Sequence, residues 1–424
     1  MMVRLAQGIL LLAVLTPRAM TWRDLPEAVQ RALAHSGLGA ATFSQYIEKL
    51  DGETARRLRE GEHDHLIFYI LQSQAFTKRP RIEPALSARA LVERLPAGER
   101  ACYLADPPCV PPSERIPPDA RARLDDFRMS PRTPSTDERL NYFRDVALSG
   151  LDMQSEYLRA MRFLYKKEFI LNRQTSAVNA LYASRGHSSD TTLAANYAVW
   201  NALAVLRGIR PEAQLNRVLI VGPGLDLAPR TRLVDSIPPQ SYQPFAVMDA
   251  LIGLSLSRSA DLDIQCYDIN PRVIQFLRRF PQNPRLFLTT EPGDPEYEAY
   301  ARKAGSSIGE RTPASLVVGS EYANRVTASN LNIVTQRPAG APQFDLVVAT
   351  NVLLYFEGHE LLLGLTNIAA LLKPGGYLIH NDMRPALDAN VHLLNLHAIA
   401  ARTLRLSPPK AADPLYDTFA IYQR

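Results

Sequence analysis

Two glycines, Gly222 and Gly224, follow directly on the apolar run Arg217–Val221. Glycine has no Cβ, so it tolerates a positive φ and leaves room where a side chain would collide with a ligand. An apolar run that ends in Gly-Pro223-Gly is typical of a buried parallel strand entering a tight turn. The pattern predicts a turn whose backbone approaches a nucleotide-like ligand closely.

Asp268 ends a second segment, 261–268, that we expect to be a strand, and its carboxylate could accept hydrogen bonds from both vicinal hydroxyls of a ribose. A third run, 344–351, ends in Asn351. Because ligands of open α/β sheets bind outside the carboxyl ends of the strands, we expect these residues and the glycine turn to face one crevice. Two other interpretations stay open: Asp268 caps the helix that begins near Pro271, and Asn351 is a helix cap.

A fourth segment, 371–379, contains Lys373-Pro-Gly-Gly376, which ends a helix and begins a strand. Taken in order, the four segments resemble the Rossmann-like S-adenosylmethionine-dependent methyltransferases over residues 190–424. The resemblance implies an α/β fold with a doubly wound, mostly parallel sheet of seven strands. It also implies that the final segment, 417–422, is the antiparallel edge strand, and that S-adenosyl-L-methionine is the cofactor.

Within that superfamily, Asn330-Leu331 followed by Asn351-Val352-Leu-Leu-Tyr355-Phe356 is most similar to the chemotaxis-receptor glutamate methyltransferases. The resemblance assigns ten residues to the cofactor. They are Gly222 and Gly224 at the methionine moiety, Asp268 at the ribose, Asn330 and Leu331 near the adenine, Asn351 and Val352 along the pocket, and Pro223, Asp226 and Ile269 beside them.

Two positions depart from the family pattern. Asp226 stands where a third glycine is usual, and Ile220 stands where an acidic residue often precedes the first glycine. A non-catalytic binding or scaffold protein that keeps the fold is therefore the alternative hypothesis. A nicotinamide-dependent oxidoreductase is disfavoured, because Leu227 replaces the last glycine of Gly-x-Gly-x-x-Gly.

Methyl transfer from a sulfonium is an in-line displacement, for which an enzyme aligns the reacting atoms and excludes water. A carboxylate acceptor needs no base, whereas an amine or hydroxyl acceptor does. Tyr355, His380 and His187 are the candidates for contact with the acceptor, and a purely structural role is the alternative for Tyr355 and His380. The sequence identifies no catalytic residue, and the acceptor is either a small molecule or a protein carboxylate.

One loop before the glycine strand is expected to close over the cofactor, as the corresponding segment does in methyltransferases of this type. Its residues Arg185, His187 and Asp190 would then contact the methionine carboxylate or the substrate. The simpler interpretation is that Asp190 or Ser189 caps a helix. The polar stretch 305–315, in the long interval after Asp268, is a second candidate for a lid.

With 46% hydrophobic residues the chain can bury a large core, and its length of 424 residues predicts more than one domain. The formal net charge is +5, and no run of Lys and Arg alternates with aromatic residues, so a nucleic-acid partner is not indicated. The spacing of Cys and His residues indicates no metal site.

A short basic start and the apolar stretch 5–16 make residues 1–20 resemble a signal peptide or membrane anchor. Cys102 and Cys109 flank a Pro-rich turn and could form a disulfide if the chain were exported. The methyl donor is made inside cells, which favours the cytoplasmic side, with membrane association through residues 1–20. Export by a cleaved signal is the alternative.

Apolar residues at helical spacing, for example at 42–50 and 65–74, predict helices throughout the first half of the chain. The expected organisation has four parts. They are the signal-like or anchor segment 1–20, a helical N-terminal domain 21–135, a helical connecting region 136–210 that packs on the sheet domain, and a Rossmann-like methyltransferase domain 211–424.

Overall fold

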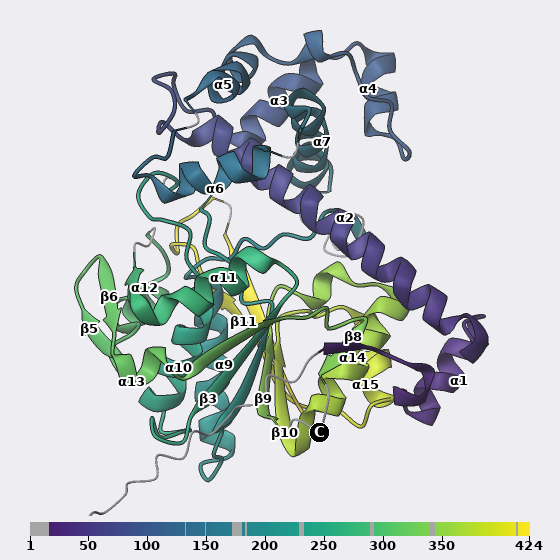
Figure 1. Cartoon of the computed structure of the whole chain (residues 1–424), viewed down its shortest axis with the longest axis vertical. Helices are drawn as coiled ribbons and strands as arrows, with labels where there is room; N and C mark the ends of the chain where they lie inside the picture. The colour runs from purple at the N-terminus through teal and green to yellow at the C-terminus, as the bar shows by residue number, and fades with distance from the viewer. Residues whose placement is uncertain are drawn as a thin grey trace, which may run out of the picture.

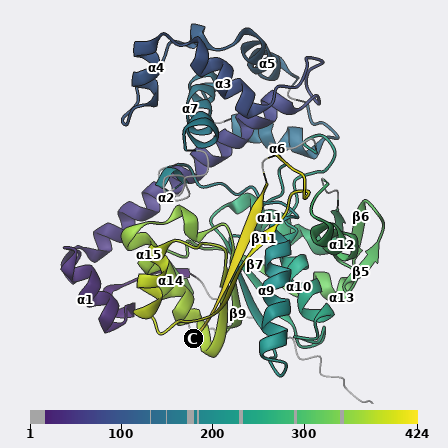
Figure 2. The same ribbon diagram turned by 180° about the vertical axis from the view of Figure 1, so that it is seen from behind.

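The computed structural model describes residues 17–131, 133–148, 150–171, 180–182, 185–228, 233–288, 292–338, 344–412 and 414–424. A central twisted sheet has helices on both of its faces, and a group of helices lies beyond one end of the strands (Figure 1). The view from behind shows the same layers (Figure 2).

Within the described residues, the main sheet has seven strands in the order β11-β12-β10-β9-β2-β3-β7. Their bounds are β2 (Arg217–Val221), β3 (Asp263–Asp268), β7 (Val326–Asn330), β9 (Phe344–Ala349), β10 (Leu372–His380), β11 (His397–Arg405) and β12 (Tyr416–Gln423). Among them only β12 runs opposite to the other strands, and it pairs antiparallel with β10 and with β11. This doubly wound, mostly parallel sheet confirms the predicted fold class.

The position predicted for the last strand is wrong. β12 lies between β10 and β11, so β11 forms the edge of the sheet. The burial of the two strands gives the reason: Phe419–Tyr422 of β12 are buried, whereas most of β11 is exposed or half-buried. An apolar strand gains more from an interior place with a neighbour on each side.

Alternate residues of β2 enter different cores, as a strand with both faces covered requires. Val218 and Ile220 belong to one core cluster, while Leu219 and Val221 belong to the other. The first cluster includes residues of α9 (Ala195–Ile209), α10 (Gln243–Gly253) and α11 (Pro271–Arg279). The second includes residues of α1 (Glu27–His35), α14 (Gly358–Leu371) and α15 (Pro385–His392).

The direction in which the chain adds strands to the sheet reverses between β2 and β9. From β2 it adds β3 and then β7 on one side, and it returns to place β9 on the other side of β2. Such a switch leaves a crevice at the carboxyl ends of the two strands, where ligands of open α/β sheets bind. The sheet topology therefore locates a candidate site before any side chain is considered.

One long helix, α2 (Ala40–Gln72), crosses above this end of the sheet (Figure 1). The predicted helices 42–50 and 65–74 are parts of it, joined through a polar middle. It leads to a group made of α3 (Pro84–Arg94), α4 (Ala97–Leu104), α5 (Pro118–Met129), α6 (Glu138–Ala147) and α7 (Met153–Tyr165). Within this group Cys102 and Cys109 are joined by a disulfide.

The beginning of the described chain belongs to the sheet half of the molecule. β1 (Pro17–Ala19) pairs antiparallel with β8 (Gln336–Pro338), and Met20 is buried. Residues of α1 and of the start of α2 share a core with α14 and the sheet. We therefore place residues 17–50 with the sheet; the rest of the predicted leader, 1–16, lies outside the described residues. No helix in the described part of the chain has the length and apolarity to cross a membrane.

The long interval between β3 and β7 forms a small subdomain. It contains α12 (Pro295–Lys303), α13 (Ser320–Ala323) and a sheet in the order β4 (Arg285–Phe287), β6 (Ser315–Val318), β5 (Gly309–Arg311). None of the described residues from β4 to α13, 285–323, lines the cavity at the switch point. The prediction that residues 305–315 form a lid over that cavity is therefore wrong.

Candidate functional site

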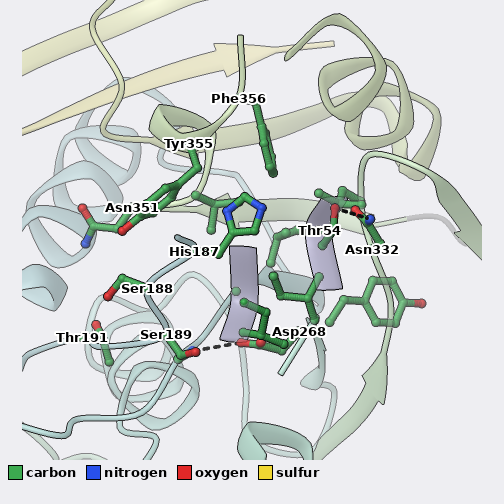
Figure 3. A pocket seen from close by; sticks show the side chains of 18 of the residues that line it. Thr54, His187, Ser188, Ser189, Thr191, Asp268, Asn332, Asn351, Tyr355 and Phe356 are labelled. Carbon is green, nitrogen blue, oxygen red and sulfur yellow. Dashed lines mark hydrogen bonds between the residues drawn. The ribbon is translucent and has the colours of Figure 1, made fainter. Parts of the chain in front are cut away.

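A cavity lies at the carboxyl ends of β2, β3 and β9 (Figure 3), with about 710 Å³ of atom-free space that includes open solvent at its mouth. Its floor is the sheet end, and its roof is α2 together with residues 185–191, which we name the strap. The described residues that line it are Thr54, Leu58, His187, Ser188, Ser189, Asp190, Thr191, Val221, Gly222, Gly224, Tyr267, Asp268, Ile269, Leu331, Asn332, Ile333, Thr350, Asn351, Val352, Tyr355 and Phe356.

The glycine turn lies at the cavity, and both glycines have the positive φ that the sequence predicted, +65° at Gly222 and +66° at Gly224. The expected reason for glycine at these positions was room for a ligand, and the structure shows a different reason. A Cβ on Gly222 would lie 2.5 Å from Val352 Cγ2, and one on Gly224 would lie 2.5 Å from the Ser189 carbonyl oxygen. The missing side chains thus make room for other parts of the protein that wall the cavity.

Asp268 ends β3 with its carboxylate in the cavity wall. One oxygen accepts a hydrogen bond from the Gly224 N–H at 3.2 Å, and the other accepts from the Asn270 N–H at 2.7 Å. Burial raises the pKa of this carboxyl to about 6, against the lowering effect of these backbone donors. The cap of α11 is Asn270, whose side chain accepts from the Arg272 N–H, so the helix-cap interpretation of Asp268 is wrong.

Apolar side chains line the cavity beyond Asp268. They come from Ile269, Leu331 and Ile333. Asn330 is exposed and does not line the cavity; its amide donates to the carbonyls of Asp268 and Ile269 at 2.9 and 3.0 Å. Asn330 thus braces the strand end, and its position near the adenine of a bound cofactor stays a prediction.

The polar residue of this wall is Asn332, which the sequence reasoning missed. Its amide donates to Asp51 at 3.0 Å and to Thr54 at 3.2 Å, so it ties the wall to α2 (Figure 3). The signal in the sequence was weak, since Asn332 lies two positions beyond the asparagine that the family resemblance selected.

Asn351 and Val352 follow β9 and line the cavity, while their contact with a cofactor stays a prediction. Asn351 has a φ of +57°. Its N–H and side-chain oxygen bond to the Asn381 side chain, both at 2.8 Å. No side chain caps the short helix Leu353–Tyr355 that follows. The helix-cap interpretation of Asn351 is wrong.

The strap is held against α2 by its backbone. The His187 N–H donates to the Arg57 carbonyl at 2.7 Å, and a Cβ on Gly61 would lie only 1.9 Å from the His187 carbonyl oxygen. Buried Arg57 also donates from its guanidinium to the carbonyls of Arg185 and Tyr355, each at 3.0 Å. The polar middle of α2 contains no motif for a ligand site, so the sequence did not reveal its residues Thr54 and Leu58.

His187 lies in the cavity beside Tyr355 and Phe356, as Figure 3 shows. Its ring meets both aromatic rings edge to face, at 5.5 and 6.2 Å between centroids. Burial, helped by the positive charge of Arg57, lowers the pKa of His187 to about 3, so the imidazole is neutral at physiological pH. Of the predicted substrate contacts, His187 and Tyr355 line the cavity.

His380 does not line the cavity, so its prediction as a substrate contact is wrong. It is fully buried and stacks on Tyr422 at 5.2 Å, while its Nδ1 accepts from the Asp382 N–H at 3.1 Å. Burial lowers the pKa of His380 to about 4. Its position at the strand end suggested the site, but its side chain stacks on Tyr422 of the neighbouring strand β12.

Pro223 and Asp226, both predicted at the cofactor, are absent from the described cavity wall. Asp226 is buried on the far side of the turn, where its N–H and carbonyl bond to the chain at Gln240 and to Arg139. Burial raises the pKa of the Asp226 carboxyl to about 6. The residue that replaces the usual third glycine therefore serves the packing of the turn.

No family model matches this chain, and no curated protein matches it. Among solved structures, the N-methyltransferase NodS from Bradyrhizobium japonicum WM9, solved with S-adenosyl-L-homocysteine, is 14% identical; the match covers 59% of this chain and 98% of that one, with a TM-score of 0.29. The magnesium protoporphyrin IX methyltransferase ChlM from Synechocystis PCC 6803, solved with bound SAM, is 12% identical, with coverage of 69% and 99% and a TM-score of 0.29.

Sequence identities and TM-scores this low do not define the class of fold. The strand order of the sheet defines it. The central β2, the switch to β9 and the antiparallel β12 inserted beside β10 make the fold that of the Rossmann-like methyltransferases. The closer resemblance to chemotaxis-receptor glutamate methyltransferases stays a prediction.

Proposed function

We propose that this protein is an S-adenosylmethionine-dependent methyltransferase. One observation carries the proposal: the buried carboxylate of Asp268 faces a cavity at the switch point of the sheet, next to the Gly222–Gly224 turn. A carboxylate at the end of the second strand is placed to accept hydrogen bonds from the vicinal hydroxyls of a ribose.

The cavity fits the nucleoside half of the cofactor. Beyond Asp268, the apolar side chains of Ile269, Leu331 and Ile333 offer surfaces on which a flat base can pack. The carboxylate already receives two backbone N–H donors, and each oxygen retains acceptor capacity for a hydroxyl. These residues would hold the nucleoside.

The amino-acid half would lie toward the glycine turn and the strap. No Lys or Arg is among the described residues that line the cavity. The hydroxyls of Ser189 and Thr191 would therefore hold the carboxylate of the methionine moiety by hydrogen bonds. When bound, S-adenosylmethionine supplies an activated methyl group. The strap and α2 orient the reactants beneath them and exclude water.

The direct test is the affinity of the full-length protein for S-adenosylmethionine and S-adenosylhomocysteine, measured by isothermal titration calorimetry. We expect micromolar dissociation constants for both, because the cavity wall contacts the nucleoside that the two molecules share. A folded protein that binds neither would contradict the proposal. Binding without methyl transfer to any acceptor would instead favour the scaffold hypothesis.

Binding should also depend on pH through Asp268. Only the ionised carboxylate accepts hydrogen bonds with both oxygens, and its pKa is about 6. At a pH one unit lower, about one carboxyl in ten is ionised. We expect S-adenosylhomocysteine to bind up to about tenfold more weakly at pH 5 than at pH 7.5.

Asp268 should make the free energy of unfolding change with pH in the direction opposite to the change in affinity. Because its pKa is higher in the folded chain than the ordinary value of 3.8, the folded state binds more protons between those values, so this carboxyl favours folding more as the pH falls. Weaker binding at pH 5 is thus not an effect of Asp268 on unfolding. Asp268→Asn should remove the pH dependence of the affinity; an unchanged dependence would assign it to another group.

A further inference from the structure

A second chamber adjoins the cofactor cavity, with about 650 Å³ of atom-free space that includes open solvent at its mouth. Four residues line both spaces: Ser188, Asp190, Asn351 and Tyr355. The two chambers therefore share a wall made by the strap and by the segment that follows β9. A molecule in the second chamber would lie next to one in the first, as an acceptor must lie next to a methyl donor.

Aromatic rings surround the second chamber. Phe68 comes from α2, Phe163 from α7, Tyr182 from the connecting segment and Tyr355 from the sheet end. Tyr182 meets the rings of Phe163 and Tyr355 edge to face, at 5.8 and 5.9 Å between centroids. Walls of this kind suit a flat aromatic molecule, which offers both faces and edges for such contacts.

The one guanidinium among the described residues of the chamber is already compensated. Arg185 pairs with the buried carboxylate of Asp64 at 3.0 Å, and its guanidinium lies over the Phe163 ring at 3.9 Å. Asp64 also pairs with Arg159 at 2.9 Å. Because this cation already has a carboxylate partner, the chamber favours a neutral molecule over a carboxylate.

A hydroxyl and an imidazole meet in this wall. The Nε2 of His65 lies 2.7 Å from Ser188 Oγ. His65 is buried on α2 and lines only the second chamber, whereas Ser188 lines both spaces. A neutral imidazole with Nε2 as acceptor can take the serine proton, and the serine oxygen can take a proton from a molecule on the other side.

We infer that the second chamber binds the methyl acceptor, that this acceptor is a small aromatic molecule with a phenolic hydroxyl, and that Ser188 and His65 remove its proton. The inference rests on the proposed function. The phenol passes its proton to Ser188 Oγ, and Ser188 passes its own to His65 Nε2. The phenolic oxygen bonds to the methyl carbon as the carbon–sulfur bond breaks with its electron pair left on sulfur. The products are an aryl methyl ether, S-adenosylhomocysteine and protonated His65, which returns its proton to solvent.

The test uses full-length protein saturated with S-adenosylhomocysteine, after calorimetry has shown that it binds. The probes are 4-fluorophenol, 4-fluoroanisole, 4-fluorobenzylamine and 4-fluorobenzoate, each titrated by ¹⁹F NMR. We expect 4-fluorophenol to bind most tightly of the four probes. His65→Gln should weaken the binding of 4-fluorophenol about tenfold, which is the contribution of one hydrogen bond to a polar partner. S-adenosylhomocysteine affinity should stay unchanged in this variant.

The matched control is His63→Gln, on the same helix but outside the chamber, which should leave phenol binding as it is. Ser188→Ala is a second variant, should His65→Gln fail to fold, and it should weaken 4-fluorophenol but not 4-fluoroanisole. Three results would overturn the inference. They are tighter binding of 4-fluorobenzoate or 4-fluorobenzylamine than of 4-fluorophenol, equal binding of 4-fluorophenol by variant and wild type, and no binding of any of the four probes. Failure of S-adenosylhomocysteine to bind would be seen first and would overturn the proposed function with it.

Discussion

Replacement of Asp268 by alanine is expected to weaken binding of S-adenosylhomocysteine by at least about a hundredfold. A hydrogen bond to a charged group contributes about 1.5–3 kcal/mol, and the ribose would make two of them to this carboxylate. Every 1.4 kcal/mol corresponds to a tenfold change in affinity. The substitution also removes the acceptor of the Gly224 and Asn270 N–H groups, which loosens the turn beside the ligand. Isothermal titration calorimetry of both proteins measures the effect.

Asp263 offers a matched control, because it begins the same strand that Asp268 ends. Asp263→Ala lies at the opposite end of β3 and should leave the affinity within about twofold of wild type. Asp268→Asn should be intermediate, since the amide retains one acceptor oxygen. If Asp268→Ala bound as tightly as wild type while remaining folded, the ribose assignment and the orientation of the cofactor would both be wrong.

The second large effect is expected at Gly61, in the helix that covers the cavity. Gly61→Ala would place a Cβ 1.9 Å from the His187 carbonyl oxygen, and backbone atoms cannot yield as the end of a side chain can. The strap must then move away from α2, which strains the bond between the His187 N–H and the Arg57 carbonyl. We expect a loss of about 1–3 kcal/mol in the free energy of unfolding, typical of overpacking. Urea denaturation measures it.

Gly52 provides a control of opposite sign. It lies in the same helix, and a Cβ added there would have no other atom within 4 Å. Gly52→Ala should therefore raise the free energy of unfolding by roughly 0.5–1 kcal/mol, because alanine loses less conformational entropy in a helix. S-adenosylhomocysteine should bind more weakly to the Gly61 variant and normally to the Gly52 variant. Equal stability of the two variants would show that the strap does not depend on this contact.

The Rossmann-like half was predictable because its signals are local. The glycine turn Gly222–Gly224 with its positive φ, the carboxylate of Asp268 and the strand end at Asn351 each depend on a few consecutive residues. Parallel strands buried on both faces leave continuous apolar runs, and their carboxyl ends meet at one edge. Order along the chain was therefore enough to bring these residues to one cavity.

Contacts between segments distant in the sequence could not be predicted from such local signals. Burial of the apolar residues of β12 decided its place inside the sheet. His380 lies away from the cavity because its ring stacks on Tyr422. The roof of the cavity required α2 to pass over the strap, with Gly61 meeting His187 across more than a hundred residues of sequence. The sequence by itself determined the parallel strands, the turn and the carboxylate, because these follow from short-range patterns. Only the tertiary structure decided what closes the cavity and what lies beside it, because packing between remote segments leaves no periodic trace in either of them.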